Sequence, residues 1–297
     1  MQPESRQSAS PIILPLQWIL FLGLASVAIL GLNACGMLAQ LARATESRTL
    51  SATFVPGESL RVTTANGAVS VTVEAGRTDV KVDAKLNATG SSYEEALDRL
   101  AQFAVIVDHA EGNVLDISID YGPAGQKNSD GCSFEVRLPA VAGVSVNTRN
   151  GSINLTDTAG AADLHTSNGK ITVVRHDGPV LAKTSNGSVK AEIVSGKINV
   201  KTSNGTITYI ASTEAAKPFS LRSSNGSIRI TIPDTIGGRI NATTSNGFIK
   251  LTGTASQNVK IQGTKKNRTF TLDDQPDHED SIASTSNGSI TIQIDNH

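Results

Sequence analysis

Aromatic side chains, cysteines and an excess of one charge are all scarce in this sequence. Of its 297 residues, 4% are aromatic, one is tryptophan and two are cysteine, and the formal net charge is −1. Because the chain has no strong basic excess, its composition argues against binding to nucleic acid. The few aromatic residues, together with 26 glycines, favour a thin all-β fold over an enzyme with a deep core.

The sequence also lacks the motifs of catalysis. No two histidines have the spacing of a metal-binding pair, and no G-x-S-x-G elbow, phosphate-binding loop or dinucleotide fingerprint is present. Some β-helical proteins are polysaccharide-active enzymes, which use a groove with clustered carboxylates and basic residues. Residues 147–252 contain only six acidic side chains, mostly in different repeats, so this alternative is the least favoured. We predict a protein that is not an enzyme and that has no cofactor and no metal site.

One repeated phrase dominates the second half of the chain. Lys-Thr-Ser-Asn-Gly occurs at Lys183 and again, 18 residues later, at Lys201. Related Asn-Gly pairs follow at intervals of 18, then 21 and finally 41 residues, the last being room for two turns of chain; the asparagines are Asn150, Asn168, Asn186, Asn204, Asn225, Asn246 and Asn287. An outlying pair, Asn66-Gly67, matches the same pattern. Self-similarity at a fixed period indicates a repeat architecture.

Each Asn-Gly pair opens an alternating segment. Apolar or small residues stand second and fourth after the glycine, as Ile207 and Tyr209 do after Gly205. Alternation with period two is typical of a half-buried strand. Glycines also recur every nine residues from Gly151 to Gly205, so each 18-residue unit holds two short strands and two turns.

Two architectures fit this unit: an antiparallel meander with Asn-Gly hairpin turns, and a β-solenoid of stacked coils. Only stacking explains identical residues every 18 positions, because copies then lie about 4.8 Å apart. We therefore predict a β-solenoid in which the seven repeat asparagines form a structural ladder of turns. Asparagine and glycine would serve these turns by accepting positive φ. Glycosylation of the Asn-Gly-Ser/Thr triplets is the weaker alternative, and calcium is rejected because the turns lack aspartate.

The N-terminus predicts export from the cytoplasm. An apolar run, Ile12–Leu32, ends in Leu-Asn-Ala-Cys-Gly, which is similar to a bacterial lipoprotein signal with Cys35 as the lipidated residue. An uncleaved transmembrane anchor and ordinary signal cleavage after Ala44 remain alternatives. If Cys35 is acylated or removed, Cys132 has no disulfide partner. We expect a membrane-anchored protein of the cell envelope, with its repeat domain outside the cytoplasm.

The domain boundaries follow from these patterns. We predict a signal or anchor segment (1–35), a linker (36–49), a β-rich capping region (50–145) and a solenoid of about seven coils (146–295). The only predicted helix is 92–103, where Ser92 and Glu95 form a capping box and Tyr93, Leu97 and Leu100 share one face. A cap of this kind would cover the open end of the solenoid.

The Ser-Asn-Gly-x-Ile turn, the strand FEVRLPAVAGVSVNTRNGSINL and the helix at 92–103 together resemble the putative-adhesin β-strand-repeat family. That family is a bacterial envelope domain of unknown function, and the resemblance covers about 53–295. It implies an exported or membrane-anchored protein and supplies no catalytic residues. The predicted function is a non-catalytic binding, adhesin-like or scaffold module. The alternative is the exported domain of a membrane protein that senses envelope stress.

One feature of the repeats suggests a ligand. His165, Lys183, Lys201 and Arg222 each stand three residues before a repeat asparagine, so strand alternation would turn them outward as one basic column. The column is either a solvated face that resists edge pairing or an anion-binding stripe for envelope glycans, lipids or a partner protein. The acidic stretch 273–280 is expected to be a surface loop, with a calcium site or a contact to the stripe as alternatives.

Overall fold

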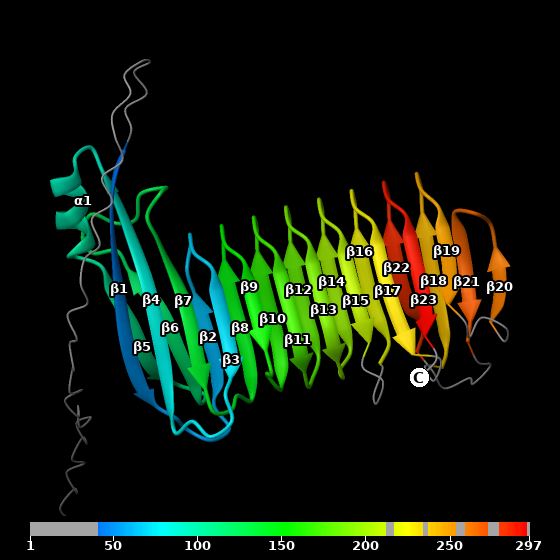
Figure 1. Ribbon diagram of the computed structural model, residues 1–297, viewed down its shortest axis with the longest axis horizontal. Helices are drawn as coiled ribbons and strands as arrows, with labels where there is room; N and C mark the ends of the chain where they lie inside the picture. The colour runs from blue at the N-terminus through cyan, green and yellow to red at the C-terminus, as the bar shows by residue number, and fades with distance from the viewer. Residues whose placement is uncertain (1–40, 212–216, 234–236, 254–258, 273–278, 296–297) are drawn as a thin grey trace, which may run out of the picture.

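The protein is a long, flat stack of strands (Figure 1). This computed structural model describes residues 41–211, 217–233, 237–253, 259–272 and 279–295. Within those ranges it contains 23 strands and one helix, arranged in two large sheets. The predicted all-β repetitive fold is confirmed. Cys35 and the apolar run 12–32 lie outside the described residues.

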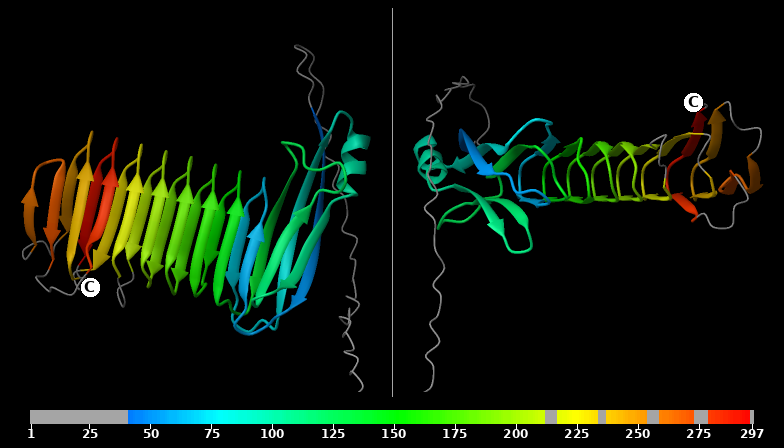
Figure 2. Two further views of the ribbon diagram at one scale, coloured as in Figure 1. Left: turned by 180° about the vertical axis from the view of Figure 1, so that it is seen from behind. Right: turned by 90° about the horizontal axis from the view of Figure 1, so that it is seen from below.

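The two sheets face each other along the whole stack (Figure 2). Sheet A contains, in spatial order, β1 (Ala42–Thr53), β4 (Asp79–Gly90), β7 (Gly131–Leu138), β3 (Val69–Val73), β9 (Ile153–Thr156), β11 (Ile171–His176), β13 (Val189–Val194), β15 (Ile207–Ala211), β17 (Ile228–Pro233), β23 (Ile290–Asp295) and β19 (Ile249–Gly253). Sheet B contains β20 (Lys260–Gly263), β21 (Asn267–Thr271), β18 (Arg239–Thr244), β22 (Ser281–Thr285), β16 (Phe219–Ser223), β14 (Ile198–Thr202), β12 (Val180–Thr184), β10 (Ala161–Thr166), β8 (Gly143–Thr148), β2 (Ser59–Thr63), β6 (Val114–Asp120) and β5 (Ala104–Ala110).

The repeats stack in parallel and in register. Val180 lies opposite Ile198, and Lys183 lies opposite Lys201, between β12 and β14. The same 18-residue offset relates β11 to β13 in sheet A. A meander would pair consecutive strands antiparallel. The parallel ladders therefore exclude the meander and show that the fold is a solenoid.

The core is a narrow apolar layer between the two sheets. Ile198 and Val200 of β14 are fully buried, whereas Asn199 between them is exposed. Two of the largest buried side chains, Tyr209 and Phe219, meet with ring centroids 5.4 Å apart. Each fully buried side chain of this size stabilises the fold by about 1.5–3 kcal/mol.

The edge of the stack that carries the Asn-Gly turns, here called the turn edge, is held by a continuous chain of amides. Each asparagine Nδ2 donates to the Oδ1 of the asparagine in the neighbouring coil, over 2.6–2.8 Å. At the first coil, Asn66 Nδ2 donates instead to the carbonyls of Asn128 and Asp130. Because all these amides point the same way, their dipoles reinforce one another.

A second ladder runs beneath the amides. The threonine two positions before each repeat asparagine (Ser223 in the coil of Asn225) is buried, and its hydroxyl donates to a glycine carbonyl of the neighbouring coil, as Thr184 does to Gly169 over 3.1 Å. The predicted reason for the turn glycines was wrong. Gly187 does not have a positive φ; a Cβ there would lie 1.9 Å from the carbonyl oxygen of Gly169. These glycines are needed because the coils approach so closely.

The coils do not follow sequence order at either end of the stack. The first coil, β2–β3, lies between β6–β7 and β8–β9. The last coil, β22–β23, lies between β16–β17 and β18–β19. The segment between Asn246 and Asn287 holds an antiparallel hairpin, β20–β21, beside β18, and not the predicted degenerate coil. Each of these two coils therefore pairs on both sides and is protected from fraying.

The capping region differs from its predicted boundaries. Residues 42–49, expected in the linker, form the first part of β1, which pairs antiparallel with β4 over its whole length. This edge strand is polar, so no apolar alternation marks it. The predicted boundary between the capping region and the solenoid, at residues 145 and 146, falls inside β8, and β2 of the capping region already pairs with that strand. Both sheets are therefore continuous from the capping region into the repeats.

The helix is shorter than predicted and turns a different face inward. α1 spans Tyr93–Leu100, and Ser92 Oγ accepts from Glu95 N over 3.1 Å. Ala96 and Leu100 are buried, whereas Tyr93 and Leu97 are exposed.

A buried ion pair holds α1 to the loop between β6 and β7. Arg99 donates to Asp130, and Asp130 also accepts from the Thr89 amide and hydroxyl, each over 2.9 Å. Burial alone would raise the pKa of Asp130, but these donors hold it below its ordinary value.

Candidate functional site: a basic groove on sheet B

The four residues of the predicted basic column lie side by side on the outer face of sheet B. His165 is opposite Lys183, Lys183 opposite Lys201, and Lys201 opposite Arg222. The alternation that buries Ala182 and Val200 places the two lysines in solvent. The structure thus brings together four side chains that span 57 residues of sequence, from 165 to 222.

Three residues of the column, His165, Lys183 and Lys201, line a shallow groove of about 490 Å³. The groove follows the stack across β8, β10, β12 and β14, near the turn edge. Its lining consists of Asn147, Thr148, His165, Thr166, Ser167, Lys183, Thr184, Ser185, Lys201 and Ser203. Each lining side chain carries a polar or cationic group, which suits a hydroxylated or anionic ligand.

Three cations of the column have no ion-pair partner among the described residues: Lys183, Lys201 and Arg222. Neighbouring strands lie about 4.8 Å apart, so these like charges repel one another unless counter-ions or a ligand screen them. His165 differs, because its Nε2 lies 2.7 Å from Asp163 Oδ1. Any positive charge on His165 is therefore balanced within its own strand. The cations that line the groove are Lys183 and Lys201, and Arg222 continues their line on the next strand.

The serines of the groove were not singled out from the sequence. Ser167, Ser185 and Ser203 were included only in the turn phrase. Their signal was their constant offset of two residues from His165, Lys183 and Lys201, which places one hydroxyl beside each basic side chain. The repeat phrase therefore serves the turn and also lines the groove.

The acidic stretch 273–280 does not meet the basic column in its described part. Glu279 pairs with Lys197, and Asp280 accepts from Arg239 and Asn241, both over 2.9 Å. Residues 273–278 lie outside the described residues. The described contacts therefore tie this stretch to the starts of β14 and β18, away from the turn edge.

Other reactive groups offer no second centre in the described part of the chain. No group of three or more His, Cys, Asp and Glu side chains there could hold a metal ion. Cys132 is buried, and burial raises the pKa of its thiol to about 12, so it is not a nucleophile at neutral pH. Within the same ranges, no helix is long and apolar enough to cross a bilayer.

Comparison with known families recognises the C-terminal part of the repeats. Residues 161–297 match a domain of unknown function (DUF7330). The predicted resemblance to a domain of unknown function with putative-adhesin relatives is confirmed. Among curated proteins, no sequence matches this chain.

Several solved structures resemble the chain at low similarity. A putative adhesin from Bacteroides fragilis is 13% identical, with a TM-score of 0.40, over 84% of this chain and 97% of that one. A putative adhesin from Parabacteroides distasonis is 10% identical, with a TM-score of 0.36, over 84% and 97%. A putative lipid binding protein from the same organism is 11% identical, with a TM-score of 0.37, over 84% and 96%. Likeness of this degree decides neither fold nor function, which both rest on the chain's own residues.

Proposed function

We propose that this protein is an exported, non-catalytic binding module of the bacterial cell envelope, which holds a linear anionic polymer in the groove on sheet B. The observation that carries the proposal is the line of Lys183, Lys201 and Arg222, unpaired among the described residues, beside a row of serine hydroxyls. An acidic glycan offers both carboxylates for the cations and hydroxyls for the serines.

The shape of the groove favours an extended ligand over a compact one. The groove runs across strands, so each step of about 4.8 Å presents another cation and another hydroxyl. No single residue dominates such a site, and affinity comes from several weak contacts made together. The contacts are exposed, so each contributes up to about 1 kcal/mol and weakens as salt is added.

The test compares two double charge reversals. Lys183→Glu with Lys201→Glu changes the groove, and Arg229→Glu with Lys250→Glu makes the same charge change on the exposed outer face of sheet A. Binding of soluble alginate, measured by calorimetry at low salt, should fall by at least tenfold for the groove variant and little for the control, with the β-sheet circular dichroism unchanged. Equal losses would assign binding to net charge alone, and no salt-sensitive binding by the wild type would reject the proposal.

Tethering to a membrane is the second part of the proposal. The support is the apolar run Ile12–Leu32 followed by Cys35. Cys35→Ser should abolish acylation and leave an uncleaved precursor, which mass spectrometry of the membrane fraction would detect. Unchanged mass with retention in the membrane would assign the tether to a transmembrane segment instead.

A further inference from the structure

The Asn-Gly turns of the solenoid contain no acidic residues. Each turn can be taken as six residues, from the outward-facing residue three positions before the asparagine to the residue after the glycine. None of the eight segments contains Asp or Glu; they are 63–68, 147–152, 165–170, 183–188, 201–206, 222–227, 243–248 and 284–289. The same edge carries Arg149 and Lys170, both exposed and without an ion pair among the described residues. A line of turns with cations and no anions is an electropositive edge.

The opposite edge has a different character. Asp157 and Asp177 are exposed at its corners, one coil apart. Asp157 is bridged by Arg175, and Asp177 accepts from Ser195. The acidic stretch that ends in Glu279 and Asp280 also enters β22 on this side. The solenoid is therefore polarised across its width, with cations alone on the turn edge.

The distal end of the turn edge adds both charge and an apolar side chain. Residues 235–272 contain six Lys and Arg and no Asp or Glu, and three of these cations, Lys265, Lys266 and Arg268, lie at or beside this edge. The turn between β20 and β21 carries exposed Lys265 and Lys266, and the Lys266 carbonyl accepts from Thr244 N, which places this turn at the same edge.

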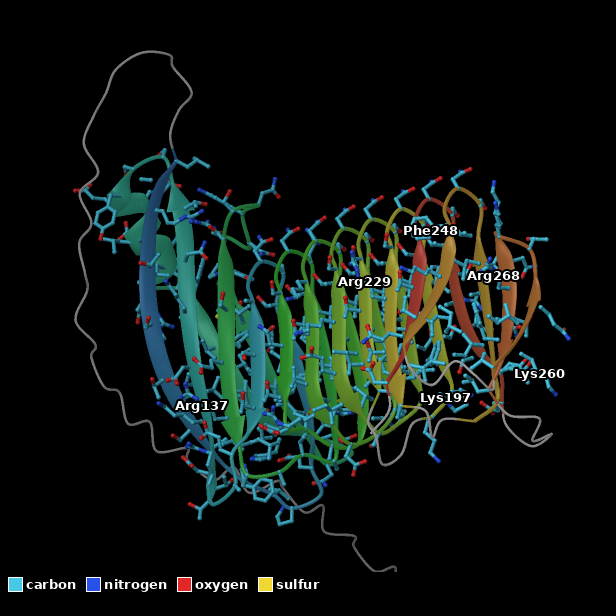
Figure 3. The ribbon with its side chains drawn as sticks, turned by 45° about the vertical axis from the view of Figure 1, so that its right-hand side comes forward. Arg137, Lys197, Arg229, Phe248, Lys260 and Arg268 are labelled. Atoms are coloured by element: carbon cyan, nitrogen blue, oxygen red, sulfur yellow. The ribbon has the colours of Figure 1, made fainter. Side chains whose placement is uncertain are left out.

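Phe248 stands at that corner. The position after the turn glycine holds Ala, Ser, Thr or Lys in the other coils, but here it holds phenylalanine that is 59% exposed. Figure 3 shows Phe248 just before the start of β19, on the side of the turns, near Arg268. Arg268 donates to the Ile249 carbonyl over 3.1 Å, so its cationic group is held beside this phenylalanine. The corner combines an exposed aromatic ring with several cations.

The chain also enters the fold at the turn edge. β1 begins at Ala42, and in Figure 1 this end of β1 lies on the side of the Asn-Gly turns. Residues 33–41 separate it from the end of the apolar run at Leu32. Nine residues reach at most about 32 Å, so an apolar run placed in a bilayer would hold the β1 end of this edge close to the headgroups.

We propose that the turn edge docks on an anionic lipid bilayer, with the solenoid lying along the membrane and Phe248 inserted at its far end. Each cation near such a surface strengthens binding about fivefold. An aromatic side chain beside these cations is suited to the headgroup region of the bilayer. A soluble polymer would gain little from Phe248, which is why the bilayer is the favoured occupant. Glu94 and Asp98 of α1 are exposed, and an anionic bilayer repels their negative charges. The contact is therefore limited to the coils and does not include the helix.

The test measures lysine exposure in the full chain, reconstituted through its own N-terminus. Lysines are acylated with a water-soluble reagent on vesicles of phosphatidylcholine alone and on vesicles that also contain phosphatidylglycerol, and each rate is read by mass spectrometry. Lys170, Lys265 and Lys266 should react at least fivefold more slowly on the anionic vesicles. Lys197 and Lys217, which precede β14 and β16 at the opposite edge, should react equally on both. Equal protection of both edges, or of neither, overturns the proposal.

A variant arm separates the lipid from other anions. Lys265→Glu with Lys266→Glu, and separately Phe248→Ser, should each restore the reactivity of Lys170 on anionic vesicles, whereas Lys197→Glu with Lys217→Glu should not. Protection by alginate in solution, without protection by vesicles, would identify a polymer as the occupant and reject the membrane. The groove variant Lys183→Glu with Lys201→Glu tests the proposed function on alginate alone, so the two ideas can fail independently.

Discussion

Asn246 donates a hydrogen bond to Asn287 over 2.7 Å, although 41 residues of chain separate them. Asn287 in turn donates to Asn225, also over 2.7 Å. The last repeat asparagine of the sequence, Asn287, is thus the penultimate one of the ladder. This order follows from insertion of the last coil between two earlier ones, and it makes the chain end part of the stack.

Removal of the last coil should therefore cost more than the loss of a terminal repeat. Truncation after Asp280 would leave the facing edges of β16–β17 and β18–β19 unpaired. We expect β18–β21 to lose protection together with the deleted coil, which hydrogen exchange read by mass spectrometry would show. A loss confined to residues 281–297 would contradict the insertion.

The amide ladder should need both the donor and the acceptor of each asparagine. Asn186→Asp keeps an acceptor for Asn204 but cannot donate to Asn168 when ionised. We expect a loss of about 1–3 kcal/mol in the free energy of unfolding, measured with denaturant at neutral pH. Ser185→Ala, at the adjacent exposed turn position, is the control and should change stability by less than about 0.5 kcal/mol.

The turn glycines should not tolerate even a methyl group. In Gly187→Ala the new Cβ would lie 1.9 Å from the Gly169 carbonyl oxygen, so the coils must separate locally. A loss of about 2–4 kcal/mol is expected, as for other overpacked sites. Ser188→Ala, one residue along and exposed, provides the matched control. Thermal unfolding of the two variants measures the difference, and equal melting temperatures would refute the close-approach argument.

The inward and outward faces of a strand can be compared with one substitution at adjacent positions. Ile198→Asp buries a carboxylate in a thin apolar layer, where an unpaired charge is costly. Asn199→Asp makes the same side chain in solvent. Circular dichroism should show loss of several coils in the first variant and none in the second.

His176 should make the solenoid sensitive to acid. Burial lowers the pKa of its imidazole below the ordinary value, its Nδ1 meets Thr158 Oγ1 at 2.9 Å, and its Nε2 has no hydrogen-bond partner. The backbone of Gly160 and of Pro179 and the Asp177 carboxylate favour the charged form of the imidazole, but burial opposes it more strongly.

The sign of the pH effect follows from the lowered pKa. The unfolded chain takes up a proton near pH 6.5, before the folded chain does, so stability falls as the pH drops below about 6.5. Melting temperatures between pH 7.5 and 5 measure the slope. His176→Val, which copies Val194 in the next coil, should flatten that part of the curve. An unchanged slope would mean that other groups set the acid sensitivity.

The features that could be predicted from the sequence are mainly those that repeat. The phrase at Lys183 and Lys201 predicted strands, stacking, the asparagine ladder and the outward direction of the lysines, because each depends only on the period and on strand alternation. The cap was harder. β1 is a polar edge strand with no alternation to mark it, and the exposed Tyr93 and Leu97 of α1 follow the same helical spacing as a buried face.

The sequence alone determined that this chain forms coils of two strands, since the same residues return at a fixed interval and gain most by lying over their copies. Only the tertiary structure decided which coil lies beside which. Every coil presents nearly the same edge, so local pairing energy does not distinguish the neighbour in sequence from the neighbour after next. The order β16, β22, β18 is set by the connections and caps at the ends of the stack, whose contacts are made between residues far apart in the chain.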